Sequence, residues 1–204
     1  MATLTQKKSS YSYARAVAKF GSGSSSSSTT NYSSTSSYSS SGKVYKVGDI
    51  YDENGKKGVV FEVDATGKHG KIVSITCSGY DQAWALGTEQ NRFIGATDEY
   101  DGEKNMNVIR QQSNWRSNYP AFAWCASLGD GWYLPAKNEW ETIYSLKYKI
   151  ESKLNRSLNI YFWTSTEENE MYSGEYCSCN ITHQGKFTYY CKSRENNVFA
   201  IAKF

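Results

Sequence analysis

The Ser-rich segment 21–42 most strongly limits what this chain can fold into. Nearly all of its side chains are Ser, Thr, Tyr or Gly, so the segment has little apolar surface whose burial could offset the entropy lost on ordering. We expect a flexible linker that spans about 5–6 Å times the square root of its length. The sequence therefore predicts a short N-terminal anchor segment, residues 1–20, and one folded domain, residues 43–204. A tail without a role is the alternative for the linker.

The composition excludes several classes of protein. A net charge of +3 without a basic stripe argues against a nucleic-acid partner. The longest apolar runs are too short to cross a bilayer, so we expect no membrane insertion. Residues 1–8 lack the apolar stretch of a secretory signal, which predicts synthesis in the cytoplasm without a signal peptide. Because there are 5 cysteines, an internal disulfide framework cannot pair all of them.

Hydrophobic periodicity and turn residues predict strands, then helices, then strands. Residues 58–63 and 71–75 form a hairpin in this interpretation, and helices are expected near 105–112, at 120–128 and from Pro135 to about Leu154. The later strands are expected at 161–165, 175–180, 187–191 and 198–204. This order indicates an α+β fold in which two helices, besides the short one near 105–112, pack on short antiparallel strands. The indole rings of Trp132, Trp140 and Trp163 are expected in the core.

Four motifs follow one another along residues 43–204, and the chain then closes on Val198–Phe204. The motifs are Gly58–Phe61 with Gly67–Gly70, Asp101-Gly102 with Asn105, Gly131–Pro135 with Glu139, and Phe162–Glu167. Together they resemble the bacterial and phage C-type-lectin-fold domains of the collagen-like-protein C-terminal type. Relatives of these domains include the formylglycine-generating enzyme fold and the variable proteins of diversity-generating retroelements. Family members commonly end Val-Arg-Ala-Val-Arg-Ala-Phe, and Phe199 and Ala202 replace the two arginines here.

Residues 168–199 are rich in Tyr, Ser, Asn and Cys, and the first three are residues that antibody paratopes use for recognition. In retroelement variable proteins, mutation of adenines turns Asn codons into codons for Tyr, Ser, Cys, His or Thr, but not Lys, Glu or Gln. The resemblance therefore implies a diversified ligand-binding surface with fixed positions at Glu175, Gln184, Lys186 and Lys192. The candidate ligand-binding residues are Asn169, Tyr172, Ser173, Tyr176, Cys177, Cys179, Asn180, Thr182, His183, Tyr189, Tyr190, Cys191 and Ser193.

The resemblance implies a non-enzymatic binding protein of the phage tropism-determinant type. Such a protein would lie at the tip of a tail fibre in the virion, attached through residues 1–20, and would bind a protein or glycan receptor on a bacterial surface. The resemblance also implies a homo-oligomer, a trimer, in which multivalency would strengthen weak contacts. One alternative is a bacterial surface or secreted protein of the same fold with a fixed ligand. Another is a formylglycine-generating-type oxidase that depends on Cys179 or Cys191.

No cofactor, catalytic residue or metal is assigned from the sequence, but two metal alternatives stay open. Cys177, Cys179, His183 and Cys191 are ligand types that zinc accepts, although the Cys-x-Cys spacing is tighter than usual. The loop Asp98–Glu103 offers the carboxylate oxygens that calcium prefers, although such a charge run is usually solvated.

Overall fold

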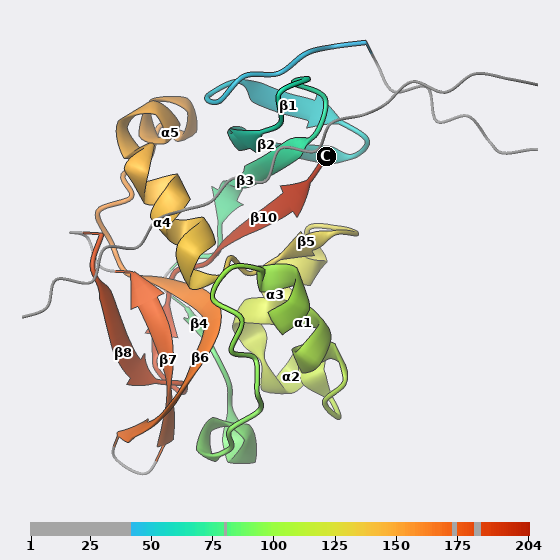
Figure 1. The fold of residues 1–204 in the computed structure, drawn as a ribbon. Coiled ribbons are helices and arrows are strands. Elements are labelled where there is room, and N and C mark those ends of the chain that lie inside the picture. Colours follow the sequence, from blue (N-terminus) through green and yellow to red (C-terminus); the bar gives the residue numbers. More distant parts are fainter. Residues whose placement is uncertain (1–41, 80, 173–174, 182–184) are drawn as a thin grey trace, which may run out of the picture. The chain divides into compact units, whose positions relative to one another are not determined.

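The structure is a computed structural model that describes residues 42–79, 81–172, 175–181 and 185–204, with side chains described outside 170–184. The predicted anchor segment and almost all of the predicted linker lie outside the described residues. The domain combines antiparallel sheets with several helices, so the predicted α+β class is confirmed (Figure 1). None of the helices in the described ranges is long and apolar enough to cross a membrane.

A five-stranded antiparallel sheet forms one part of the domain. Its strands, in spatial order, are β1 (Ile50–Glu53), β2 (Lys56–Val63), β3 (Gly70–Cys77), β10 (Phe199–Lys203) and β5 (Trp132–Tyr133). The predicted hairpin is confirmed, because β2 pairs with β3 in a register that places Val60 opposite Ile72. The C-terminal strand β10 lies between β3 and β5, so the last residues of the chain complete the sheet (Figure 1).

The described ranges contain five α-helices and one 3₁₀ helix, so the expectation of two helices packed on the strands is wrong. They are η1 (Gly87–Asn91), α1 (Gly102–Arg110), α2 (Trp115–Asn118), α3 (Pro120–Ser127), α4 (Lys137–Ser145) and α5 (Lys147–Leu154). The helix expected at 120–128 is confirmed as α3, which has Pro120 in its first turn. The helix expected near 105–112 is α1, which begins earlier because the Asp101 carboxylate accepts the N–H groups of Glu103 and Lys104.

The prediction of one helix from Pro135 to Leu154 is wrong. The chain leaves the helical conformation at Leu146 (φ −100°, ψ 14°), and α5 begins at the next residue. Ile143 before the break and Ile150 after it are both fully buried. Because the break is only one residue long, the apolar residues on both sides still face the core. Helical periodicity in the sequence therefore could not reveal it.

All four predicted later strands are present; the last is β10 of the five-stranded sheet, and the other three form a separate sheet. This separate sheet consists of β6 (Phe162–Tyr172), β7 (Glu175–Ile181) and β8 (Phe187–Cys191), with β7 in the middle. β6 is longer than expected because it stays paired with β7 as far as Tyr172 and Glu175. A further pair of two-residue strands, β4 (Gln82–Ala83) and β9 (Glu195–Asn196), was not predicted.

The core is built around tryptophans, and the expected burial of Trp132, Trp140 and Trp163 is confirmed. The ring of Trp140 stacks on Phe162 with centroids 4.8 Å apart. Its indole N–H donates to the carbonyl of Trp163 at 3.0 Å, and the indole N–H of Trp163 donates to the carbonyl of Gln82 at 2.8 Å. A buried N–H donor without a hydrogen-bond partner destabilises the folded state, so these bonds allow the indole rings to be buried in a core without water.

Candidate ligand-binding surface

The three-stranded sheet brings most of the predicted ligand-binding residues together. Those placed on it are Asn169 and Tyr172 on β6, Tyr176, Cys177, Cys179 and Asn180 on β7, and Tyr189, Tyr190 and Cys191 on β8. Ser193 follows in the turn between β8 and β9, where its side chain is half-buried. Ser173, Thr182 and His183 lie outside the described residues. Pairing across the sheet places Cys177 opposite Cys191 and Cys179 opposite Tyr189, so residues distant in sequence become neighbours.

The two predicted tyrosine anchors on β8 have different environments. The side chain of Tyr189 is 46% exposed. Tyr190 is half-buried, with its ring 6.0 Å from that of Tyr161 and the Arg194 guanidinium 3.9 Å above it. Consecutive residues of a strand point to opposite faces, which explains the difference. Tyr189 is therefore accessible to a ligand, while Tyr190 braces β8 against the domain.

A buried ion pair lies at the end of the sheet, immediately after β8. Lys192 is fully buried, and its ammonium group contacts the Glu167 carboxylate. The same group donates to the carbonyl of Arg92 at 2.6 Å and lies 4.6 Å from the ring centre of Trp84. The Glu167 carboxylate also accepts the backbone N–H groups of residues 94–96 at 2.6–3.2 Å. Both charges thus have partners, as buried charges require. The structure gives Lys192, which we expected to be a fixed position, a structural role.

The turn after β8 is also held through its backbone. The carbonyl of Lys192 accepts the N–H groups of Trp84 and Ala85 at 2.9 and 3.1 Å. Trp84 is fully buried, and its indole N–H donates to the carbonyl of Thr164. We call Glu167, Lys192 and Trp84 the Lys192 clamp. Because none of these three residues lies on β7 or β8, the clamp fixes the end of the sheet whatever side chains those two strands carry.

Exposed apolar side chains lie beside the sheet and were missed by the sequence analysis. Helix η1 packs against β7. Leu86 before η1 is 41% exposed and Phe93 after it is 39% exposed. Arg92, which directly precedes Phe93 in the sequence, is held by an ion pair with Glu89 at 2.8 Å. We call Leu86, Arg92 and Phe93 the η1 rim. Apolar residues exposed on an irregular loop leave no periodic signal, so the sequence pattern could not reveal them.

The C-terminal end of the predicted variable region does not belong to the surface. Residues Asn196, Asn197, Val198 and Phe199 are buried, and Phe199 begins the interior strand β10. The side-chain amide of Asn197 donates to the carbonyl of Tyr161 at 3.0 Å. These positions are therefore determined by packing, and the candidate surface ends at the turn before β9.

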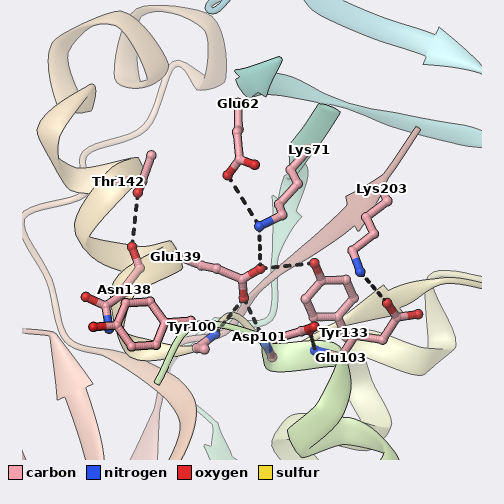
Figure 2. A network of polar contacts seen from close by, with 12 residues as sticks. Glu62, Lys71, Tyr100, Asp101, Glu103, Tyr133, Asn138, Glu139, Thr142 and Lys203 are labelled. Atoms are coloured by element: carbon pink, nitrogen blue, oxygen red, sulfur yellow. Dashed lines mark hydrogen bonds and ion pairs between the residues drawn. The ribbon is translucent and has the colours of Figure 1, made fainter. Parts of the chain in front are cut away.

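A second buried carboxylate, Glu139, joins two of the sequence motifs (Figure 2). Its carboxylate accepts hydrogen bonds from the N–H groups of Ala136 and Gly102 at 2.9 and 3.1 Å. It also accepts a hydrogen bond from the hydroxyl of Tyr133 at 3.1 Å and forms an ion pair with Lys71 at 3.1 Å. Burial raises the pKa of Glu139, whereas the N–H donors and Lys71 act in the opposite direction. The carboxylate has protein partners on both oxygens, so it serves as a junction of the scaffold.

Gly102 is required at this junction. A Cβ atom there would lie 2.2 Å from the carbonyl oxygen of Leu134 and 3.0 Å from the Glu139 carboxylate. The neighbouring motifs meet in the same way, because the Asn105 amide donates to the hydroxyl of Ser165 at 2.9 Å. Three of the four motifs that carry the resemblance are therefore in direct contact with one another.

The structure bears on both metal alternatives. In the loop Asp98–Glu103, Asp98 accepts the N–H groups of Tyr100 and Asp101 and pairs with Lys104, so its oxygens shape the start of α1. The backbone places Cys177 opposite Cys191, while the side chains of Cys177 and Cys179 lie outside those described, as does His183. Among the side chains that are described, no group of three or more potential metal ligands gathers.

A shallow groove of about 380 Å³ lies at the ends of β2, β3 and β10. Its lining residues include Glu62, His69, Lys71 and Phe204, and none of its lining residues belongs to β6, β7 or β8. Lys71 is paired with Glu62 and Glu139, so its charge is satisfied within the protein. The groove is thus a separate feature from the candidate surface.

Compared with known proteins, the chain matches no protein-family model and no curated protein. The function is therefore argued from the sequence motifs and the geometry of the site.

Proposed function

We propose that this protein is a non-enzymatic receptor-binding protein with a C-type lectin fold, in which the β6–β8 sheet and the turn after it form a ligand surface diversified by a retroelement. The observation that carries the proposal is the Lys192 clamp. A charged side chain that is fully buried lies directly beside strands rich in Tyr, Ser and Cys. This is the arrangement expected where a fixed scaffold borders a surface free to vary.

The C-type lectin fold in the proposal rests on the motifs and on how they pack. Glu139 contacts both Gly102 and Tyr133, and Asn105 contacts Ser165, so three of the four motifs meet. The closing segment Val198–Phe204 supplies the strand between β3 and β5. Motifs that pack on one another support common ancestry with the resembled domains more strongly than isolated matches would.

Recognition would combine variable and fixed side chains. Tyr189 supplies exposed aromatic area, and Asn169 is exposed on β6. The η1 rim adds Leu86, Arg92 and Phe93 beside the middle strand. Aromatic residues and Arg are enriched in the energetically important centres of protein interfaces. A ligand on the sheet would therefore meet constant anchors as well as the diversified positions.

In the proposal, the protein is a tail-fibre tip adhesin that determines host tropism. Residues 1–20 would attach it to the fibre, residues 21–42 would act as a tether, and three copies would act together on a protein or glycan receptor. Trimerisation would convert weak single contacts into avid binding. This placement rests on the resemblance, because residues 1–41 lie outside those described.

Sequencing the 3′ end of the gene across a population of the source would test the proposal. We expect substitutions at adenine positions of codons 168–193, with the codons of Glu167, Lys192 and residues 196–199 unchanged. A population with the same sequence throughout codons 168–193 would contradict diversification and would support the alternative of a fixed ligand.

A further inference from the structure

A second surface, centred on α5, carries basic side chains that the proposed function does not use. Lys149 and Lys153 on α5 and Arg156 just after it are exposed, and Lys147 is half-buried. No ion pair joins Lys149, Lys153 or Arg156 to any residue in the described part of the chain. By contrast, other lysines are paired with carboxylates, for example Lys57, Lys104 and Lys203. We call Lys147, Tyr148, Lys149, Lys153 and Arg156 the α5 basic surface.

Nearby acidic groups do not neutralise this surface. Glu151 is the one acidic residue among residues 147–156, and its carboxylate accepts the N–H of Leu158 at 2.6 Å. The Lys149 side chain packs against Gly48, since a Cβ atom there would lie 2.5 Å from its Cδ. The neighbouring Asp49 carboxylate accepts the backbone N–H of Lys46 at 2.8 Å. Four basic side chains, Lys147, Lys149, Lys153 and Arg156, still outnumber the two carboxylates of Glu151 and Asp49. The α5 basic surface therefore keeps a net positive charge.

Tyr148 gives the surface an aromatic group at its most prominent point. Its side chain is 84% exposed, and the Lys147 ammonium lies 5.6 Å from its ring centre. The groove described above has no lining residue from α5, so the α5 basic surface is not the wall of that pocket. Lysine stems and a tyrosine ring suit the boundary between water and lipid headgroups, where the charged ends meet phosphates.

We infer that the α5 basic surface docks the domain peripherally onto a bilayer rich in anionic lipid. Lys149, Lys153 and Arg156 would contact the lipid phosphates, and Tyr148 would lie at headgroup depth without crossing the bilayer. Figure 1 shows α5 beside β1 and β2, at the opposite end of the folded domain from η1. Lipid contact at α5 would therefore leave the β6–β8 sheet and the η1 rim available, and the inference stands independently of the proposed function.

The test compares binding of the full chain to vesicles of phosphatidylcholine alone and of phosphatidylcholine with about one third phosphatidylglycerol. We expect binding only to the acidic vesicles, and release when ionic strength rises from about 0.05 M to about 0.5 M. Each basic residue near an anionic surface contributes about fivefold in binding. K149Q/K153Q/R156Q should therefore lose about 100-fold.

The matched control is K57Q/K104Q/R110Q, which removes the same charge from exposed positions elsewhere. It should bind within about threefold of the unmodified chain, and Tyr148→Ser alone should weaken binding several-fold. Equal losses in the two triple variants would overturn the inference, because net charge alone would then explain binding. It would also be overturned by absence of binding to acidic vesicles, or by preferential capture of the protein by single-stranded DNA at equal phosphate concentration.

Discussion

The strands β10 and β8 show how differently the two sheets of the domain use their side chains. In β10, four of the five residues are buried, whereas in β8 no residue is fully buried and Tyr189 is exposed. β10 is an interior strand that pairs with β3 on one side and β5 on the other, and β8 lies at the edge of a sheet whose other strands are β6 and β7. Packing therefore constrains the sequence of β10 closely and that of β8 loosely. The Lys192 clamp lies between the strand whose sequence packing constrains closely and the strand whose sequence it constrains loosely.

The largest expected difference is between truncations in the two strands. Phe199→Ala removes a fully buried ring that lies 5.3 Å from Phe162, centroid to centroid. It should lower the free energy of unfolding by about 3–5 kcal/mol. Tyr189→Ala, at an exposed position, should change it by less than about 0.5 kcal/mol. Denaturant unfolding measures both values. Similar losses of unfolding free energy in the two variants would contradict the claim that packing constrains β10 more than β8.

The clamp should be nearly as sensitive as the core. Lys192→Met leaves the Glu167 carboxylate buried without its cation, which costs roughly 3–5 kcal/mol of unfolding free energy. Adding Glu167→Gln should recover part of that loss, because no buried charge then remains. The control is Lys186→Met, which removes an exposed lysine and should be nearly neutral. A neutral Lys192→Met would show that the clamp does not hold the sheet.

The Gly102 junction tests the scaffold without changing a charge. Gly102→Ala forces a Cβ atom against the Leu134 carbonyl, so the unfolding free energy should fall by about 1–3 kcal/mol. Gly42→Ala, where a Cβ atom would meet nothing within 4 Å, serves as the control and should be close to neutral. Chemical denaturation of the two variants would show whether the close approach at Gly102 is real; equal stabilities would argue against it.

The smallest effect is a pH dependence at Glu89 in helix η1. The hydrogen bond from Tyr119 lowers the pKa of Glu89, burial opposes this, and Arg92 lowers it further. Because the pKa is lower in the folded protein than in the unfolded chain, Glu89 stabilises the fold above its ordinary pKa of 4.5. That contribution is lost as the pH falls below this value. Unfolding measured from pH 7 to pH 3 should therefore show a cost of Glu89→Gln that shrinks with acidification. A cost that grows towards low pH would contradict the assignment.

Much of the fold could be predicted because its signals are local. The β2–β3 hairpin is marked by β-branched residues around a glycine turn, and α3 is marked by Pro120 at its start. The break at Leu146 and the two-residue strands β4, β5 and β9 leave no periodic pattern, so they were missed.

The candidate site was predictable in composition but not in arrangement. Its Tyr, Asn and Cys residues stand out in the sequence, and β6, β7 and β8 do bring them onto one sheet. The partnership of Lys192 with Glu167 joins residues 25 positions apart and depends on the tertiary fold. The burial of Phe199 likewise follows from the position of β10 within its sheet.

The most direct test of a scaffold that tolerates a changing surface is the unfolding free energy of a combined variant. Asn169→Ser, Thr188→Asn, Tyr189→Asn and Ser193→Asn would be introduced together, with Lys192→Met alone as the comparison. We predict that the four changes on the candidate surface together cost less than the single change in the clamp, which should lose roughly 3–5 kcal/mol. A combined variant that is less stable than Lys192→Met would contradict the account, because the sheet would then be part of what holds the domain together.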